Sequence, residues 1–190
     1  MKNNTPKIIF RRSWLYDRAL KPDRRFKIPS EKKMDKFLRR VRSEWGKHGN
    51  KILKEISRVT KLTWHEKEIV VYITHTVIPY SDPLTINRWS DIHTLTHELI
   101  HRILSEPENK KNYLRGLAIV SKKHPRESYK VQNHIIVHSI HAIILKKIFG
   151  EEVLNKEKKS VPDKRYIRSW KIAERDGYEN SIKALTKKFT

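Results

Sequence analysis

Hydrophobic residues recur with a helical period over most of this chain. Between residues 30 and 61 the period predicts two helices, at about 30–45 and 50–61, separated by Gly46 and Gly49. The same spacing predicts further helices at about 91–105, 110–121, 128–149, 163–176 and 179–189. Ser90 is the expected N-cap of the helix at 91–105, which Pro107 ends, and Gly150 is expected to end the helix at 128–149.

Two segments depart from this period. Residues 68–78 are β-branched and aromatic almost throughout, which predicts one long strand or two short ones. Residues 1–29 contain short apolar pieces among proline and arginine, and we interpret them as an extended arm. The expected fold class is therefore α+β, mostly helical, with a small β segment before the helix at 91–105.

The composition limits the chemistry that this chain can perform. Hydrophobic residues make up 37% of its 190 residues, and no apolar run approaches the length of a membrane span. The N-terminus has charges where a signal peptide has its apolar stretch, so we expect a cytoplasmic protein without a membrane span. Cysteine is absent, which excludes disulfides, thiolate metal sites and a cysteine nucleophile. A bound metal must be held by histidine, aspartate or glutamate.

Charge and histidine are distributed in opposite ways along the chain, whose net charge is +22. Residues 1–62 have 20 basic and 6 acidic residues, and residues 146–190 have 13 and 7. The centre, residues 63–145, has 10 and 8, yet it contains nine of the ten histidines. The pattern indicates a nearly neutral, histidine-rich centre between two basic flanks.

The chemical signal lies in His97-Glu98-Leu99-Ile100-His101, an HExxH motif in the predicted helix at 91–105. Residues four apart lie on one face of a helix, so the two imidazoles can reach one ion, and Glu98 lies beside them, about 100° around the axis. In zinc proteases such a glutamate takes a proton from a metal-bound water. The alternative is a core helix with two hydrogen-bonded histidines and a surface glutamate.

A third ligand is expected from the helix at 128–149, where His134, His138 and His141 share one stripe of an otherwise apolar sequence. Buried imidazoles need polar partners, which makes at least one of them a candidate ligand. If both His134 and His138 joined His97 and His101, the metal would have four protein ligands and no open position.

These features resemble the zincin metallopeptidases, and the helix plan resembles the gluzincins. In that group the third ligand is a glutamate on a downstream helix that often reads Asn-Glu-x-x-Ser-Asp, and the aspartate holds a motif histidine. The matching stretch here is Asn133-His134-Ile135-Ile136-Val137-His138, with histidine in place of both acidic residues. The resemblance implies that one zinc per chain is bound by His97, His101 and His134. Glu98 would be the catalytic base. Asn133, His138 or His141 would hold a metal-binding side chain in place by a hydrogen bond or would be an alternative ligand. Glu127 is a carboxylate alternative.

We therefore expect three parts: a basic N-terminal arm and helices (1–62), a zincin-like metal-binding core (63–149) and basic C-terminal helices (150–190). The first hypothesis is a zinc-dependent metallopeptidase that acts on a protein or peptide substrate. The second is a basic protein that binds DNA or RNA and has a structural or vestigial zinc site, because cations and aromatic residues alternate in the flanks. The cations proposed to contact nucleic acid are Arg11, Arg12, Arg24, Arg25, Arg39, Arg40 and Arg42.

Overall fold

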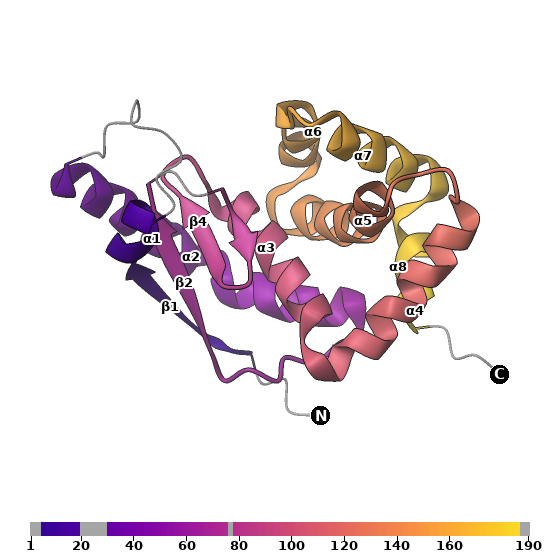
Figure 1. Cartoon of the computed structure of the whole chain (residues 1–190), viewed down its shortest axis with the longest axis horizontal. Helices are drawn as coiled ribbons and strands as arrows, with labels where there is room; N and C mark the ends of the chain where they lie inside the picture. The colour runs from indigo at the N-terminus through magenta and orange to yellow at the C-terminus, as the bar shows by residue number, and fades with distance from the viewer. Residues whose placement is uncertain (1–4, 20–29, 76–77, 187–190) are drawn as a thin grey trace.

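Four strands form one mixed sheet in the computed structural model, which describes residues 5–19, 30–75 and 78–186 (Figure 1). The strands are β1 (Lys7–Arg12), β2 (Glu68–Thr74), β3 (Tyr80–Ser81) and β4 (Leu84–Asn87), and their spatial order is β1-β2-β4-β3. The strands β1, β2 and β4 run parallel, and the short edge strand β3 is antiparallel to β4. The predicted long strand ends at Thr74, and β3 and β4 were not predicted.

Residues 7–12 are extended, as predicted, but they form a strand of the sheet rather than an arm, and residues 14–19 are helical. Strand β1 pairs with β2 from Lys7 opposite Glu68 to Arg12 opposite Ile73, and a short helix, α1 (Trp14–Ala19), follows it. Phe10 is buried and meets Trp45 edge to face, with ring centroids 6.2 Å apart. The remainder of the predicted arm, residues 20–29, lies outside the described residues.

A single helix, α2 (Glu31–Thr60), replaces the two helices predicted on either side of Gly46 and Gly49. The ring of Trp45 lies over Gly49, where a Cβ atom would overlap that ring. Gly49 therefore leaves room for a large neighbour one turn away, and the helix continues through it. Glycine inside a helix costs only about 1 kcal/mol relative to alanine, which tertiary packing offsets.

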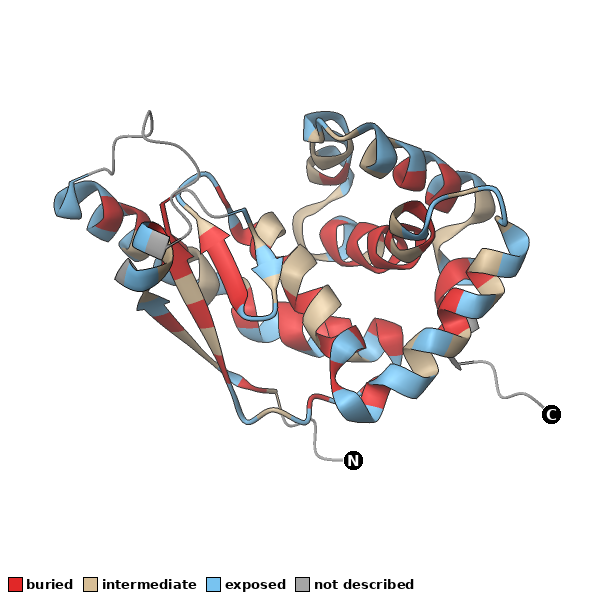
Figure 2. Ribbon diagram, in the orientation of Figure 1, coloured by how far each residue is buried: buried red, intermediate tan, exposed pale blue. Residues whose placement is uncertain are grey.

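Helix α5 (Tyr129–Phe149) lies among the remaining helices (Figure 1). These are α3 (Ile92–Ser105), α4 (Pro107–Lys123), α6 (Glu151–Ser160), α7 (Lys164–Asp176) and α8 (Tyr178–Thr186). Helix α5 contacts α2, α3, α4, α6, α7 and α8, and most of its length is buried (Figure 2). Because the stretch of α5 from Val131 to Leu145 is largely buried, polar side chains along it need partners from the surrounding helices.

The expected fold class, α+β and mostly helical with a small sheet, is confirmed. Helix α6 was missed because Leu154 is its one buried residue, which leaves no apolar period to detect. The hydrophobic core joins residues from β1 at one end of the chain to α8 at the other. None of the described helices combines the length and the apolarity needed to cross a bilayer.

We predict that Phe10→Ala lowers the free energy of unfolding by about 3 kcal/mol, because it removes a large side chain from a packed core. The matched control is Leu15→Ala on α1, where the side chain is 72% exposed. This control should change stability by less than about 0.5 kcal/mol. Urea denaturation of both variants measures the difference. Equal, small effects would mean that β1 contributes nothing to the core.

Candidate metal centre

A capping box fixes the start of α3, the helix that contains the HExxH motif. The side chain of Asp91 accepts hydrogen bonds from the backbone N–H groups of His93 (3.0 Å) and Thr94 (2.9 Å). Asp91, rather than the predicted Ser90, is thus the N-cap, since the Ser90 hydroxyl bonds Asn87 instead. The buried residues Leu95, Leu99 and Ile103 anchor the helix in the core. His97 and His101 are partly buried, one turn apart.

Three imidazoles from two helices come together where α3 packs on α5. His97, His101 and His134 each offer a ring nitrogen, and these three nitrogens all lie within 4.8 Å of one another. The Nε2 atoms of His101 and His134 are 3.3 Å apart. The three histidines form a group that is geometrically able to hold a metal ion.

The orientation of His134 is set by the backbone of its own helix. Its Nδ1–H donates to the carbonyl of Lys130, one turn earlier, over 2.8 Å. In the neutral ring, Nε2 then has a free lone pair directed at His101. A backbone carbonyl that holds the second nitrogen in this way is the usual outer contact of a metal-binding histidine. The 3.3 Å contact between the two Nε2 atoms can be satisfied by one proton or by a shared cation.

Burial keeps these imidazoles neutral, which is the form that binds metals. It lowers the pKa of His101 to about 3, with the neighbouring His134 as a further cause. Burial likewise lowers the pKa of His134 to about 4, and that of His97 falls well below its usual value. Protons therefore compete weakly for these nitrogens at neutral pH.

His138 takes its partners from α7. Its Nδ1 lies 3.0 Å from the hydroxyl of Ser169, which itself donates to the carbonyl of Tyr166. Because the hydroxyl proton is used in that way, His138 is the donor to Ser169. The ring of His138 stacks on Trp170 with centroids 4.1 Å apart. Among the described residues, His138 does not join the group of three.

His141 is 1% exposed, and neither of its ring nitrogens has a hydrogen-bond partner among the residues that the structure describes. Its ring centroid is 5.5 Å from that of His97. An imidazole without a hydrogen-bond partner in the core is costly, and none of the described residues offsets this cost for His141.

Glu98, which follows His97 on α3, is partly buried, and burial raises its pKa to about 8. The other candidates have partners elsewhere. Asn133 accepts a hydrogen bond of 2.7 Å from the hydroxyl of Tyr113 on α4. Glu127 is paired with Arg168, 2.7 Å away.

Tyr166 was not predicted as part of the site, although its ring centroid is 4.4 Å from that of His134 and 6.4 Å from that of His97. The ammonium of Lys130 lies 4.3 Å from the same ring. Tyr166 belongs to α7, which lies in the basic C-terminal part of the chain. No spacing in the sequence links α7 to the motif, because only the packing of α7 on α5 brings them together.

The candidate nucleic-acid contacts have mixed surroundings. Arg11 and Arg39 are exposed, whereas Arg12 forms an ion pair with Glu31. Two exposed arginines of α2 also bond the backbone, Arg40 to the carbonyl of Ser90 and Arg42 to that of Phe10, each over 3.1 Å. The pair Arg24 and Arg25 lies outside the described residues.

No protein-family model, curated protein or solved structure was found to match this chain.

We predict that His134→Ala reduces zinc affinity more than His138→Ala, because His134 belongs to the group of three and His138 does not. Loss of a residue that only holds a metal ligand in place usually reduces metal affinity by about 10- to 100-fold, and this is the largest effect that we expect for His138→Ala. Competition with a chromophoric chelator gives both affinities, and circular dichroism verifies that both variants fold. A larger loss for His138→Ala would exchange the two roles.

Proposed function

We propose that this protein is a zinc-dependent metallopeptidase of the zincin type. His97, His101 and His134 hold the zinc, and Glu98 is the general base. The observation that carries the proposal is the convergence of three neutral imidazoles from two helices, one of which also contains the partly buried Glu98 directly after His97. A structural site would need four protein ligands, whereas three leave a position open for water or substrate.

The donor set fits zinc in type and in spacing. Two nitrogens that bind one zinc ion tetrahedrally at about 2.0–2.1 Å lie about 3.3–3.4 Å apart. The Nε2 atoms of His101 and His134 are separated by 3.3 Å. Zinc held there would lower the pKa of a bound water and polarise a peptide carbonyl.

Glu98 is suited to receive a proton in such a site. Its pKa of about 8 reflects burial without a neighbouring cation. A cation held by the histidines would favour the carboxylate and lower this pKa toward the neutral range in which a general base is most effective. Glu98 would then be able to take a proton from the attacking water and return it to the leaving amine.

The edge of the sheet offers a place for an extended peptide. Strand β3 is the edge strand and contacts α3. Arg102, the residue after His101, bonds the carbonyl of Ser81 over 3.4 Å and the carboxylate of Asp82 over 2.5 Å. This arginine joins the β3–β4 turn to the motif helix. A substrate that adds to the β3 edge by main-chain hydrogen bonds would lie next to that helix.

We predict that Glu98→Gln retains zinc but lowers peptide hydrolysis by about 10²- to 10⁴-fold, because the amide keeps the size and polarity of the side chain but cannot act as a base. Cleavage of a fluorescein-labelled unfolded protein by zinc-loaded enzyme measures the rate, and elemental analysis measures the zinc. Unchanged hydrolysis would exclude Glu98 as the base.

The same variant has a second expected effect, which separates loss of chemistry from loss of fold. The folded-state pKa of Glu98 is raised to about 8 from 4.5, so the metal-free folded protein loses stability as pH rises above 4.5. At pH 7, Glu98→Gln should therefore stabilise the metal-free protein by up to about 3 kcal/mol, and at pH 4.5 by almost nothing. Equal stability of both proteins at pH 7 would contradict the burial of this carboxyl.

The second candidate function, binding of DNA or RNA, is favoured by one observation on α2. All ten basic side chains of this helix are exposed, and the chain has a net charge of +22. They are Lys32, Lys33, Lys36, Arg39, Arg40, Arg42, Lys47, Lys51, Lys54 and Arg58. A row of cations of this kind suits contact with phosphates without sequence preference.

If α2 contacts nucleic acid, neutralising three cations on one of its faces should weaken binding. The variant Lys32→Gln/Lys36→Gln/Arg39→Gln should reduce the slope of log affinity against log salt by about 0.9 for each duplex phosphate that these side chains neutralise in the wild type. The matched control, Lys156→Gln/Lys159→Gln/Lys171→Gln, removes the same charge from α6 and α7. Similar slopes for both variants, or no binding near 50 mM salt, would exclude α2 as the contact surface.

A further inference from the structure

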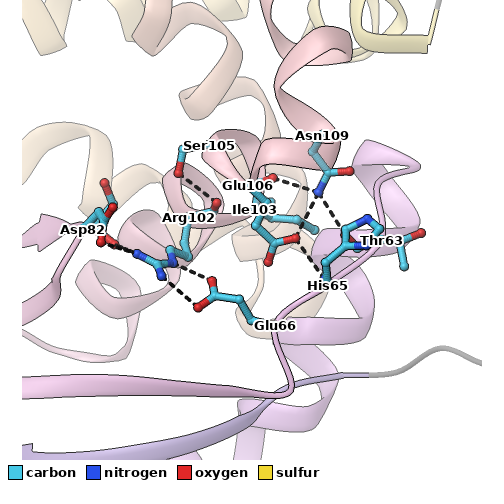
Figure 3. A network of polar contacts seen from close by, with 10 residues as sticks. Thr63, His65, Glu66, Asp82, Arg102, Ile103, Ser105, Glu106 and Asn109 are labelled. Atoms are coloured by element: carbon cyan, nitrogen blue, oxygen red, sulfur yellow. Dashed lines mark hydrogen bonds and ion pairs between the residues drawn. The ribbon is translucent and has the colours of Figure 1, made fainter.

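A second cluster of potential ligands lies at the opposite end of α3 from its N-cap. The loop between α2 and β2 passes the corner where α3 ends and α4 begins (Figure 3). His65 from the loop and Glu106 and Glu108 from the corner each offer one ligand atom, and these atoms all lie within 4.8 Å of one another.

Glu106 is the unusual member of this cluster because it is only 4% exposed. Its Oε2 atom accepts from the backbone N–H of His65 (3.0 Å) and from the amide of Asn109 (3.3 Å). The other oxygen, Oε1, is buried and has no hydrogen-bond partner among the described residues. A buried carboxylate oxygen without a partner is costly, and a cation is the partner that best offsets this cost.

The surroundings of the cluster are acidic, although the chain as a whole is strongly basic. A cavity of about 420 Å³ is lined by four carboxylates, those of Glu66, Asp82, Glu106 and Glu108, and by Arg102. Arg102 already bonds Glu66 over 2.6 and 2.8 Å and Asp82 over 2.5 Å (Figure 3). Its charge is thus directed to that side of the cavity, which leaves Glu106 and Glu108 as an acidic pair beside His65.

We propose that His65, Glu106 and Glu108 form a second metal site, separate from the three-histidine group. One imidazole and two carboxylates suit a divalent first-row transition ion such as Mn²⁺, Co²⁺ or Zn²⁺, whereas Ca²⁺ and Mg²⁺ take oxygen ligands. His65 and Glu108 are exposed, so water can complete the coordination. The ion ties the loop before β2 to the end of α3, five residues after His101, and so braces the motif helix from its C-terminal end.

The test titrates Co²⁺ into metal-free full-length protein and counts bound ions by equilibrium dialysis. Wild type should bind two Co²⁺ ions, and His97→Ala/His101→Ala should bind one. Adding Glu108→Gln to that variant should weaken the remaining site by at least about tenfold, since even loss of an outer contact has such an effect. The matched control is Glu152→Gln, which removes the charge of an exposed glutamate on α6.

The comparison also holds in the wild-type background, in case the double variant does not fold. There, His65→Gln and Glu108→Gln should each weaken one of the two sites by at least about tenfold, and Glu152→Gln should weaken neither. Equal Co²⁺ binding by Glu108→Gln and Glu152→Gln would overturn the second site. Failure of the three-histidine site would show differently, as equal binding by wild type and His97→Ala/His101→Ala.

Discussion

The burial of imidazoles between α3, α5 and α7 is the constraint on which the rest of the structure depends. Helix α5 is enclosed by six other helices, yet it contains three histidines that are 6% exposed or less. Each ring must remain neutral, and each needs polar partners, because unpaired polar groups in a core are costly. Such partners are present for His138 and His134, but the described residues supply none to His141. Ser169 and Trp170 of α7 hold His138, and a backbone carbonyl holds one nitrogen of His134.

The candidate metal centre is formed by the ring nitrogens that these partners do not occupy. The Nε2 atom of His134 faces the Nε2 atom of His101, and the two motif histidines are held one turn apart by a helix whose start is fixed by Asp91. A single cation among His97, His101 and His134 would satisfy three nitrogens at once. At the far end of the same helix, the buried Oε1 atom of Glu106 is likewise an acceptor without a hydrogen-bond partner among the described residues. Arg102 lies between the two clusters and links α3 to the β3–β4 turn.

The sequence predicted those parts of the site that depend on local spacing. His97 and His101 are four residues apart on one helix, and His134 is recognisable because it interrupts an apolar helical stripe. The parts that it did not predict depend on contacts between distant segments. Strand β1 joins β2 only after the chain has passed through α2, and Tyr166, Ser169 and Trp170 reach the histidines only because α7 packs on α5. The second cluster likewise joins His65 to a corner that lies more than 40 residues later in the sequence.

Predictions of where helices begin and end also failed in two places, at the N-cap of α3 and at the glycines inside α2. Ser90 and Asp91 are both good N-caps, and the choice follows from the bond that Ser90 makes to Asn87. Gly46 and Gly49 resemble a helix break, but the ring of Trp45 lies over Gly49 and helix α2 continues. In both cases a contact with a nearby side chain, which helix propensity does not include, determined where the helix begins or whether it continues.

The most direct test is an anomalous-difference map at the zinc edge from crystals of the zinc-loaded protein. We expect a peak about 2.0–2.1 Å from Nε2 of His134 and from one ring nitrogen each of His97 and His101, with solvent in the fourth position. Absence of a peak among these three histidines would contradict a metal centre between α3 and α5. A peak that also has His138 as a fourth protein ligand would contradict an open, catalytic site.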